Sequence, residues 1–129
     1  LERKIYRVDG VNRELIDENT KLKVGDGIVV CYDIINPTTR SFVELRALRT
    51  GALQPNVNNS GYTLGRYREV KSDEIVYYFY QLPEGHTTIE ENFTVWFEGS
   101  YSDGYATIGS LFNPSGKSNS CSGVLVVAD

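Results

Sequence analysis

The chain is poor in several residue types: it has no methionine, one histidine, one tryptophan and two cysteines in 129 residues. It also has no long hydrophobic run, since the most apolar stretch, residues 75–82, is far shorter than the ~20 residues of a membrane-spanning helix. Its 13 basic residues are scattered among 17 acidic ones, with a net charge of −4. These absences argue against a membrane span and against nucleic-acid binding, which needs clustered lysine and arginine.

The length of the chain suits one domain with one ordinary hydrophobic core. Hydrophobic residues make up 40% of it and charged residues 23%, as in a typical globular protein. Because the chain starts at Leu1 and lacks methionine, we expect a mature product or a domain excised from a larger protein, with residues 1–129 as that single domain.

The two cysteines, Cys31 and Cys121, leave two alternatives. A disulfide between them would stabilise the fold by ~4–5 kcal/mol through loop entropy. The alternation of residues 28–34, however, places Cys31 with Asp33 on the face opposite the apolar side chains. This arrangement favours two free thiols and leaves the redox compartment undecided.

Apolar and polar residues alternate in short segments that are separated by turn residues, which predicts strands. The expected strands cover residues 4–8, 21–24, 28–34, 42–46, 69–71, 75–82, 89–97, 105–112 and 124–127. Residues 53–66 are expected to be a long loop, 83–85 a tight hairpin connection, 99–104 a turn and 113–120 a loop. No segment has a sustained helical period, so the pattern predicts an all-β fold, an antiparallel two-sheet β-sandwich.

The lone histidine, His86, is the obvious candidate for a catalytic base. A catalytic triad would need it beside a nucleophile and an orienting carboxylate. His86 lies in the expected turn at residues 83–87, where a solvated side chain is the better interpretation. We therefore expect no enzymatic activity, since no nucleophile and base are paired in the sequence.

Adjacent acidic residues occur at Asp17-Glu18, Asp73-Glu74 and Glu90-Glu91. Neighbours on a strand face opposite ways, so adjacency does not build the paired carboxylates of a glycosidase. Glu91 is unusual because it shares a face with apolar residues of its strand. It lies either near a sheet edge or next to a cation, and the sequence leaves both open.

Metal and cofactor sites are not expected. Asp26, Asp33 and Asp103 lie in or near turns without the dense oxygen-ligand spacing of a calcium loop. No cysteine and histidine cluster could hold zinc, and no phosphate-binding glycine motif stands between a strand and a helix.

The segment 56–68 is the most promising surface, because it carries Tyr62, Arg66, Tyr67 and Arg68. Tyrosine and arginine are the residue types that dominate contact hot spots. One interpretation is a docking loop that contains these four residues. The other is a disordered crossover loop whose tyrosines only staple it to the sheet.

Nearly the whole chain resembles the C-terminal macroglobulin-like domain of bacterial alpha-2-macroglobulins, the tenth such domain in the usual count. The resemblance is carried by KIYRV at 4–8, LKVGD at 22–26, FVELR at 42–46, NSGY at 59–62, YREV at 67–70, YFYQLPEG at 78–85, DGYATI at 103–108 and LFNP at 111–114. Each motif is weak alone, but their order and spacing together are specific. The chain departs from the family pattern at Ala47, at Arg49-Thr50-Gly51 and at residues 112–116.

The resemblance implies one non-catalytic domain of a large secreted bacterial peptidase inhibitor, in the periplasm or on the cell surface. In such proteins a peptidase cuts a bait region, and a thioester in another domain then captures it. The C-terminal domain docks on the thioester domain, and a tyrosine from a loop shields the thioester. Tyr67 is the best match for that tyrosine and Tyr62 the second. The thioester motif Cys-x-Glu-Gln is absent here, so this chain cannot do the covalent chemistry.

A different class of function is a stand-alone adhesion or carbohydrate-binding module. In that case Trp96, Tyr77 and neighbouring tyrosines would form a stacking platform for sugars.

Overall fold

The computed structural model describes residues 1–16, 20–49, 51–63, 65–102, 106–110, 113–119 and 124–128. These ranges contain strands and no helix. The strands are β1 (Glu2–Asp9), β2 (Asn12–Leu15), β3 (Lys21–Lys23), β4 (Gly27–Asn36), β5 (Arg40–Leu48), β6 (Leu53–Pro55), β7 (Gly61–Thr63), β8 (Arg66–Val70), β9 (Glu74–Leu82), β10 (Gly85–Val95), β11 (Gly99–Ser102), β12 (Ala106–Ser110), β13 (Asn113–Asn119) and β14 (Val124–Ala128). Within the described ranges, no helix is long and apolar enough to span a membrane.

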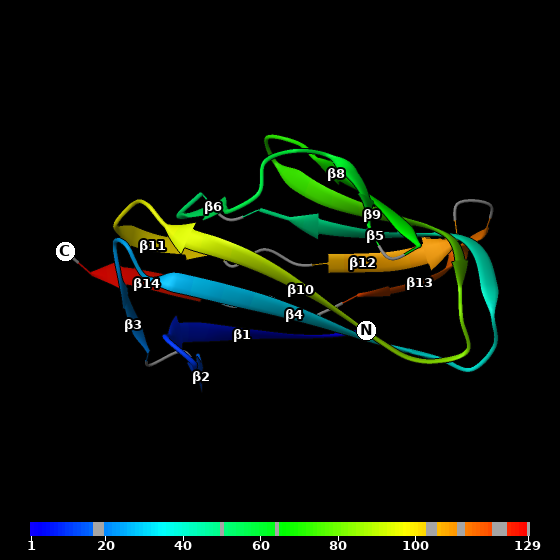
Figure 1. Ribbon diagram of the computed structural model, residues 1–129, viewed down its shortest axis with the longest axis horizontal. Helices are drawn as coiled ribbons and strands as arrows, with labels where there is room; N and C mark the ends of the chain where they lie inside the picture. The colour runs from blue at the N-terminus through cyan, green and yellow to red at the C-terminus, as the bar shows by residue number, and fades with distance from the viewer. Residues whose placement is uncertain are drawn as a thin grey trace.

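Two sheets face each other and make the sandwich (Figure 1). The five-stranded sheet has the order β2-β1-β4-β10-β6, and the six-stranded sheet has the order β13-β12-β5-β9-β8-β7. The neighbouring strands in both are antiparallel, which confirms the predicted fold class. A small sheet, β11-β14-β3, adds a parallel pair between β14 and β3 that the alternation pattern did not predict.

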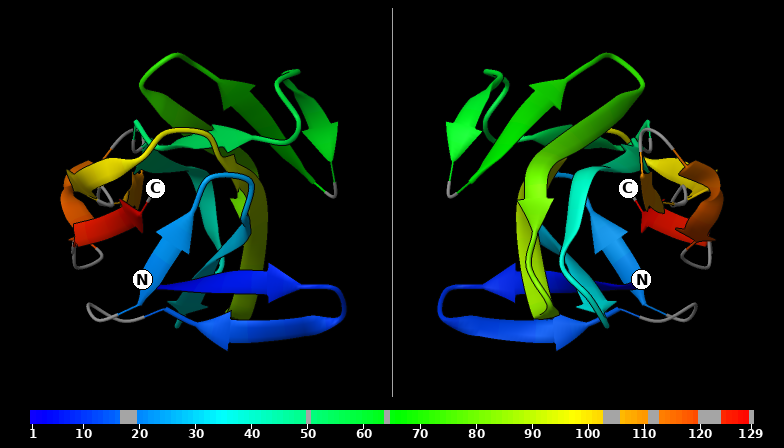
Figure 2. Two further views of the ribbon diagram at one scale, coloured as in Figure 1. Left: turned by 90° about the vertical axis from the view of Figure 1, so that its left-hand side faces the viewer. Right: turned by 90° about the vertical axis from the view of Figure 1, so that its right-hand side faces the viewer.

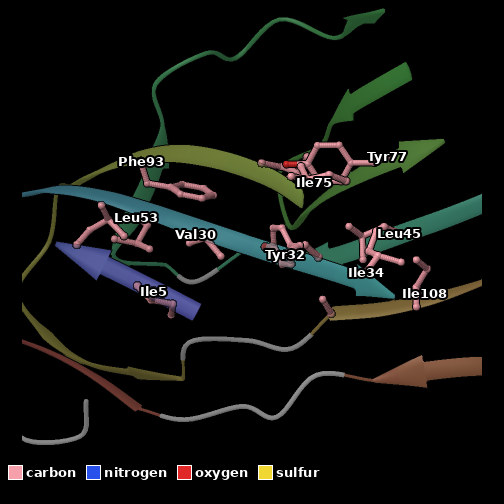
Figure 3. Close-up of a cluster of buried hydrophobic side chains, with 14 of the residues drawn as sticks. Ile5, Val30, Tyr32, Ile34, Leu45, Leu53, Ile75, Tyr77, Phe93 and Ile108 are labelled. Atoms are coloured by element: carbon pink, nitrogen blue, oxygen red, sulfur yellow. The ribbon is translucent and has the colours of Figure 1, made fainter. Parts of the chain in front are cut away.

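The core lies between the two large sheets, because one face of each is apolar. On β4 the alternate residues Ile28, Val30, Tyr32 and Ile34 are at most 5% exposed. On the opposite sheet, alternate residues of β5 and β9 are buried in the same way. Figure 3 shows side chains of both sheets meeting in this space. The alternate apolar residues of these strands therefore face the core, as the period of two predicts, and on β4 the opposite-facing Val29 and Cys31 are buried as well.

The connection at residues 83–85 is not a hairpin, so that prediction was wrong. Strand β9 pairs with β5 and β8, whereas β10 pairs with β4 and β6, so the connection crosses from one sheet to the other. Asn36, which is 5% exposed, donates from Nδ2 to the carbonyls of Leu82 and Pro83, both at 3.2 Å. Gly85 has φ of 109°, a conformation that favours glycine. A crossing and a hairpin use the same turn residues, so the sequence could not distinguish them.

Other element limits also differ from expectation. The expected loop 53–66 contains β6 and β7, the expected turn 99–104 contains β11, and the expected loop 113–120 contains β13. Strand β10 ends at Val95, two residues before the expected end at residue 97, and Phe97 is 52% exposed. Strands β6 and β11 are formed by pairing with β10 and β14, which are distant in sequence, and local propensity does not encode such pairing.

Cys31 is a buried free thiol whose Sγ lies 3.6 Å from Oε1 of Glu90. Burial raises the pKa of this thiol, and the charge of Glu90 adds to the effect. Cys121, Asp17, Glu18 and Asp103 lie outside the described residues, as do the expected strand positions 105, 111 and 112.

Candidate functional site

The hairpin β7–β8 lies at the end of the six-stranded sheet and occupies the top margin in both views of Figure 2. Its register pairs Gly61 with Arg68, Tyr62 with Tyr67, and Thr63 with Arg66. Gly65, in the turn, has φ of 81°, so a residue without a Cβ suits it. All four predicted docking residues are therefore on one small hairpin, rather than on an irregular loop.

Three tyrosines form a row on the outer face of this hairpin and of β9. Tyr62 meets Tyr67 edge-to-face, with ring centroids 4.8 Å apart at 62°. Tyr67 is the register partner of Tyr78, and their centroids are 6.5 Å apart at 35°. We call Tyr62, Tyr67 and Tyr78 the tyrosine row. Its outermost member, Tyr62, is 85% exposed, so one large amphipathic ring is offered to a partner.

A second aromatic pair extends this outer face toward β5. Tyr80, which is 75% exposed, meets the ring of Phe42 at 5.1 Å and 76°. Phe42 has φ of 56°, a positive value that non-glycine residues rarely adopt. The sequence analysis missed Tyr78, Tyr80 and Phe42. Tyr78 and Tyr80 could have been found from the alternation within β9, since Tyr77 and Phe79 occupy its buried face.

Arg68 and Tyr67 are consecutive, so the Arg68 side chain lies on the inner face, where it meets β10 of the other sheet. Its Nε is 2.6 Å from Oε1 of Glu91, and its Nη2 is 2.9 Å from Oε2. The phenol of Tyr77 donates to the same Oε1 at 2.5 Å. The side chains of Arg68 and Glu91 are only 15% and 8% exposed. We call Arg68, Glu91 and Tyr77 the clamp.

The clamp explains the odd position of Glu91 in the sequence. Of the two alternatives, pairing with a cation is observed. Burial of Tyr77, together with the charge of Glu91, raises the pKa of the phenol far above its ordinary value, so it stays a hydrogen-bond donor. A buried carboxylate that accepts three such bonds is satisfied rather than left available for chemistry.

The segment before the hairpin is fixed by backbone and polar contacts. Arg68 donates from Nη1 to the carbonyl of Asn59 at 3.1 Å and from Nη2 to that of Val57 at 2.7 Å. The amide of Val70 donates to Oγ of Ser60 at 3.0 Å. These contacts hold the segment through Arg68 and Ser60, in addition to the ring contacts of Tyr62 and Tyr67.

Arg66 differs from Arg68. Within the part of the chain that the structure describes, its guanidinium makes no hydrogen bond or ion pair. It lines a cleft of 270 Å³ between the hairpin and β10, together with Arg68, Asn59 and Asn92. Arg66 is half-buried and lies next to the turn of the hairpin.

His86 has a carboxylate partner but no nucleophile among its described contacts. Its Nε2 lies 3.1 Å from Oδ1 of Asp33, and its side chain is 60% exposed. Thr88 donates to the same oxygen at 2.8 Å. The described residues also contain no cluster of histidine, cysteine, aspartate or glutamate that could hold a metal.

Tyr77 cannot belong to the expected sugar-stacking platform. Tyr77 is 2% exposed and belongs to the core, while Trp96 is 57% exposed. The prediction was wrong for Tyr77 because every second residue of β9 faces the core.

Comparison with known proteins decides the family. Residues 1–115 match the model of the bacterial alpha-2-macroglobulin MG10 domain. The chain belongs to this MG10 family. No curated protein matches the chain.

Two solved structures have the fold of this MG10 domain. A crystal structure of a tyrosine-to-glycine mutant of Salmonella alpha-2-macroglobulin matches with a TM-score of 0.80 and 14% identity. The structure of Salmonella alpha-2-macroglobulin reacted with methylamine matches with a TM-score of 0.79 and 15% identity. Each match covers 99% of this chain and 9% of the other chain, so the MG10 domain spans about a tenth of the length of those proteins. The family and the fold that the sequence motifs indicated are thereby confirmed.

Proposed function

We propose that this MG10 domain is a non-catalytic part of a bacterial alpha-2-macroglobulin-like peptidase inhibitor, in the periplasm or on the cell surface. It docks on the thioester domain of the same polypeptide and shields the thioester until a peptidase cuts the parent protein. The observation that supports this most is the hairpin β7–β8, which presents Tyr62 at 85% exposure on an ordered sheet edge.

The chemistry of the hairpin suits a shield. A tyrosine ring excludes water from a reactive ester, while its hydroxyl finds a polar partner. Tyr67 has the motif position of the shielding residue, and Tyr62 has the exposure. The two rings pack edge-to-face with their centroids 4.8 Å apart, so they act as one unit in which Tyr67 supports Tyr62. Arg66 adds a cation to the contact, and Arg68 holds the hairpin from behind.

The test uses the intact parent protein with Tyr62→Ala, Tyr67→Ala or the control Trp96→Ala. Loss of the thioester in water is followed by titrating the thiol that it releases. We expect both tyrosine variants to lose the thioester faster than the unmodified protein. Trp96, an exposed aromatic residue that is not on the hairpin, should leave the rate unchanged. Equal rates in all four proteins would overturn the proposal.

A further inference from the structure

We infer that Arg68, Glu91 and Tyr77 form a positioning device, which sets the tyrosine row at a fixed place relative to the five-stranded sheet. This inference rests on the proposed function, because it assigns the clamp a part in presenting the shield. Without the clamp, β8 would still pair with β9, but β7 and the segment before it would be held only by the pairing with β8 and by the bond from Val70 to Ser60.

The clamp connects three parts of the molecule through one side chain. The Arg68 fork binds Glu91 on β10 in a bidentate manner and also holds the carbonyls of Val57 and Asn59. A guanidinium is planar and has fixed donor directions, so these contacts define an orientation as well as a distance. The five-stranded sheet, the segment before β7 and strand β8 are therefore held in one arrangement.

The position of the clamp bears directly on the tyrosine row. Arg68 follows Tyr67, and successive side chains of a strand face opposite ways, so fixing Arg68 inward fixes Tyr67 outward. Arg68 is also the register partner of Gly61, which precedes Tyr62. Both strands of the hairpin are thus tied to the clamp next to the residues that carry the rings.

Stability alone does not account for this arrangement. A buried ion pair can often be replaced by apolar residues of similar size with little loss of stability. The strand β7 has only three residues paired with β8 and is the last strand of its sheet, so the ladder alone holds it weakly. A directional contact at this point supplies orientation, which packing of aliphatic side chains would not.

The experiment compares two double variants of the 129-residue chain by NMR hydrogen exchange. Arg68→Met with Glu91→Leu removes the clamp without leaving a buried charge. The matched control, Arg13→Met with Glu90→Leu, removes an exposed pair that has the same chemistry one residue away on β10, with 2.5 and 3.3 Å contacts. We expect amides of residues 57–63 to exchange more than about tenfold faster in the clamp variant, while those of β4 stay unchanged. The control should change neither set.

A second variant covers failure to fold. Arg68→Lys keeps the charge but cannot reproduce the fork, so it should also speed exchange in residues 57–63 and disturb the ring contact between Tyr62 and Tyr67. Unchanged exchange and ring signals in whichever clamp variant folds would overturn the inference. So would a uniform increase over the whole chain, since that is the mark of general destabilisation.

The same clamp variants in the parent protein separate this inference from the proposed function. Faster thioester loss with faster hairpin exchange supports both. Faster hairpin exchange with an unchanged rate of thioester loss would support the positioning role of the clamp and overturn the shielding role of the hairpin.

Discussion

Two hairpins at the margins of this MG10 domain are anchored in opposite ways. The hairpin β1–β2 and the hairpin β7–β8 lie at the bottom and the top of both views in Figure 2. The first carries the ion pairs Arg7–Glu14 and Arg13–Glu90, whose side chains are between 32% and 57% exposed. The second is tied by the pair Arg68–Glu91, whose side chains are 15% and 8% exposed. Similar arginine–glutamate pairs are thus exposed at one edge of the molecule and buried at the other.

The two sets of ion pairs differ in how far they are exposed to solvent. Exposed ion pairs contribute only about 0–1 kcal/mol and are screened by salt. A buried pair stabilises little against an apolar replacement, but breaking it by removing one partner is costly. The clamp therefore fixes the position of β7–β8 more strictly than the exposed ion pairs fix that of β1–β2. The hairpin β7–β8 also presents the exposed aromatic residues.

The largest effect should come from breaking the clamp on one side. Glu91→Ala leaves Arg68 buried without its carboxylate, so the free energy of unfolding should fall by about 3–5 kcal/mol. Urea unfolding of the chain measures this. A loss below about 1 kcal/mol would mean that water already screens the pair and would remove the contrast between the hairpins.

The next effect concerns the phenol of the clamp. Tyr77→Phe keeps the ring in the core but deletes the donor that lies 2.5 Å from Oε1 of Glu91. The free energy of unfolding should fall by about 1–3 kcal/mol, because a buried acceptor loses a bond. Tyr78→Phe is the control, since that phenol lies 3.3 Å from Glu69 on the half-buried outer face and should change stability less. Equal falls in the free energy of unfolding for the two variants would contradict the role of the Tyr77 phenol in the clamp.

A smaller effect is expected at β1–β2. Arg13→Met should lower the free energy of unfolding only slightly, and added salt should reduce the difference from the unmodified chain further. Thermal unfolding at low and high ionic strength measures it. A large fall in the free energy of unfolding that does not depend on salt would show that this pair stabilises its hairpin as a buried pair does.

The smallest effect depends on pH. Hydrogen bonds from Thr88, and then from His86, lower the pKa of Asp33 below its ordinary value of 3.8. Because the folded-state pKa is lowered, the stabilisation is present above 3.8 and is lost as the pH falls through the lowered value. Thr88→Val should therefore lower the free energy of unfolding at neutral pH. In acid, the free energies of unfolding of the variant and of the unmodified chain should come closer together. A difference that stays constant with pH would exclude the linkage.

The sequence was sufficient for the fold class and the family, because both depend on local patterns. The alternation of β4 and β9 placed one face of each strand in the core, and ordered motifs across the chain indicated the MG10 domain. The same alternation flagged Glu91 as a charge on an apolar face. Its partner could not be named, since Arg68 is 23 residues away and reaches it only across the sandwich.

Features that depend on sheet pairing could not be predicted. The turn at residues 83–85 joins two sheets, and β6, within residues 53–66, pairs with the distant strand β10. The four residues that the sequence predicts to dock lie on one hairpin. Their division into outward tyrosines and an inward arginine became visible only with the register of β7, β8 and β9.

The most direct measurement of the central proposal is hydroxyl-radical footprinting of tyrosine side chains in the isolated chain and in the intact parent protein. The account predicts that Tyr62, at 85% exposure, is reactive in the isolated chain, protected in the uncut parent and reactive again after a peptidase cuts the parent. Equal reactivity of Tyr62 in all three states would contradict docking of the hairpin β7–β8.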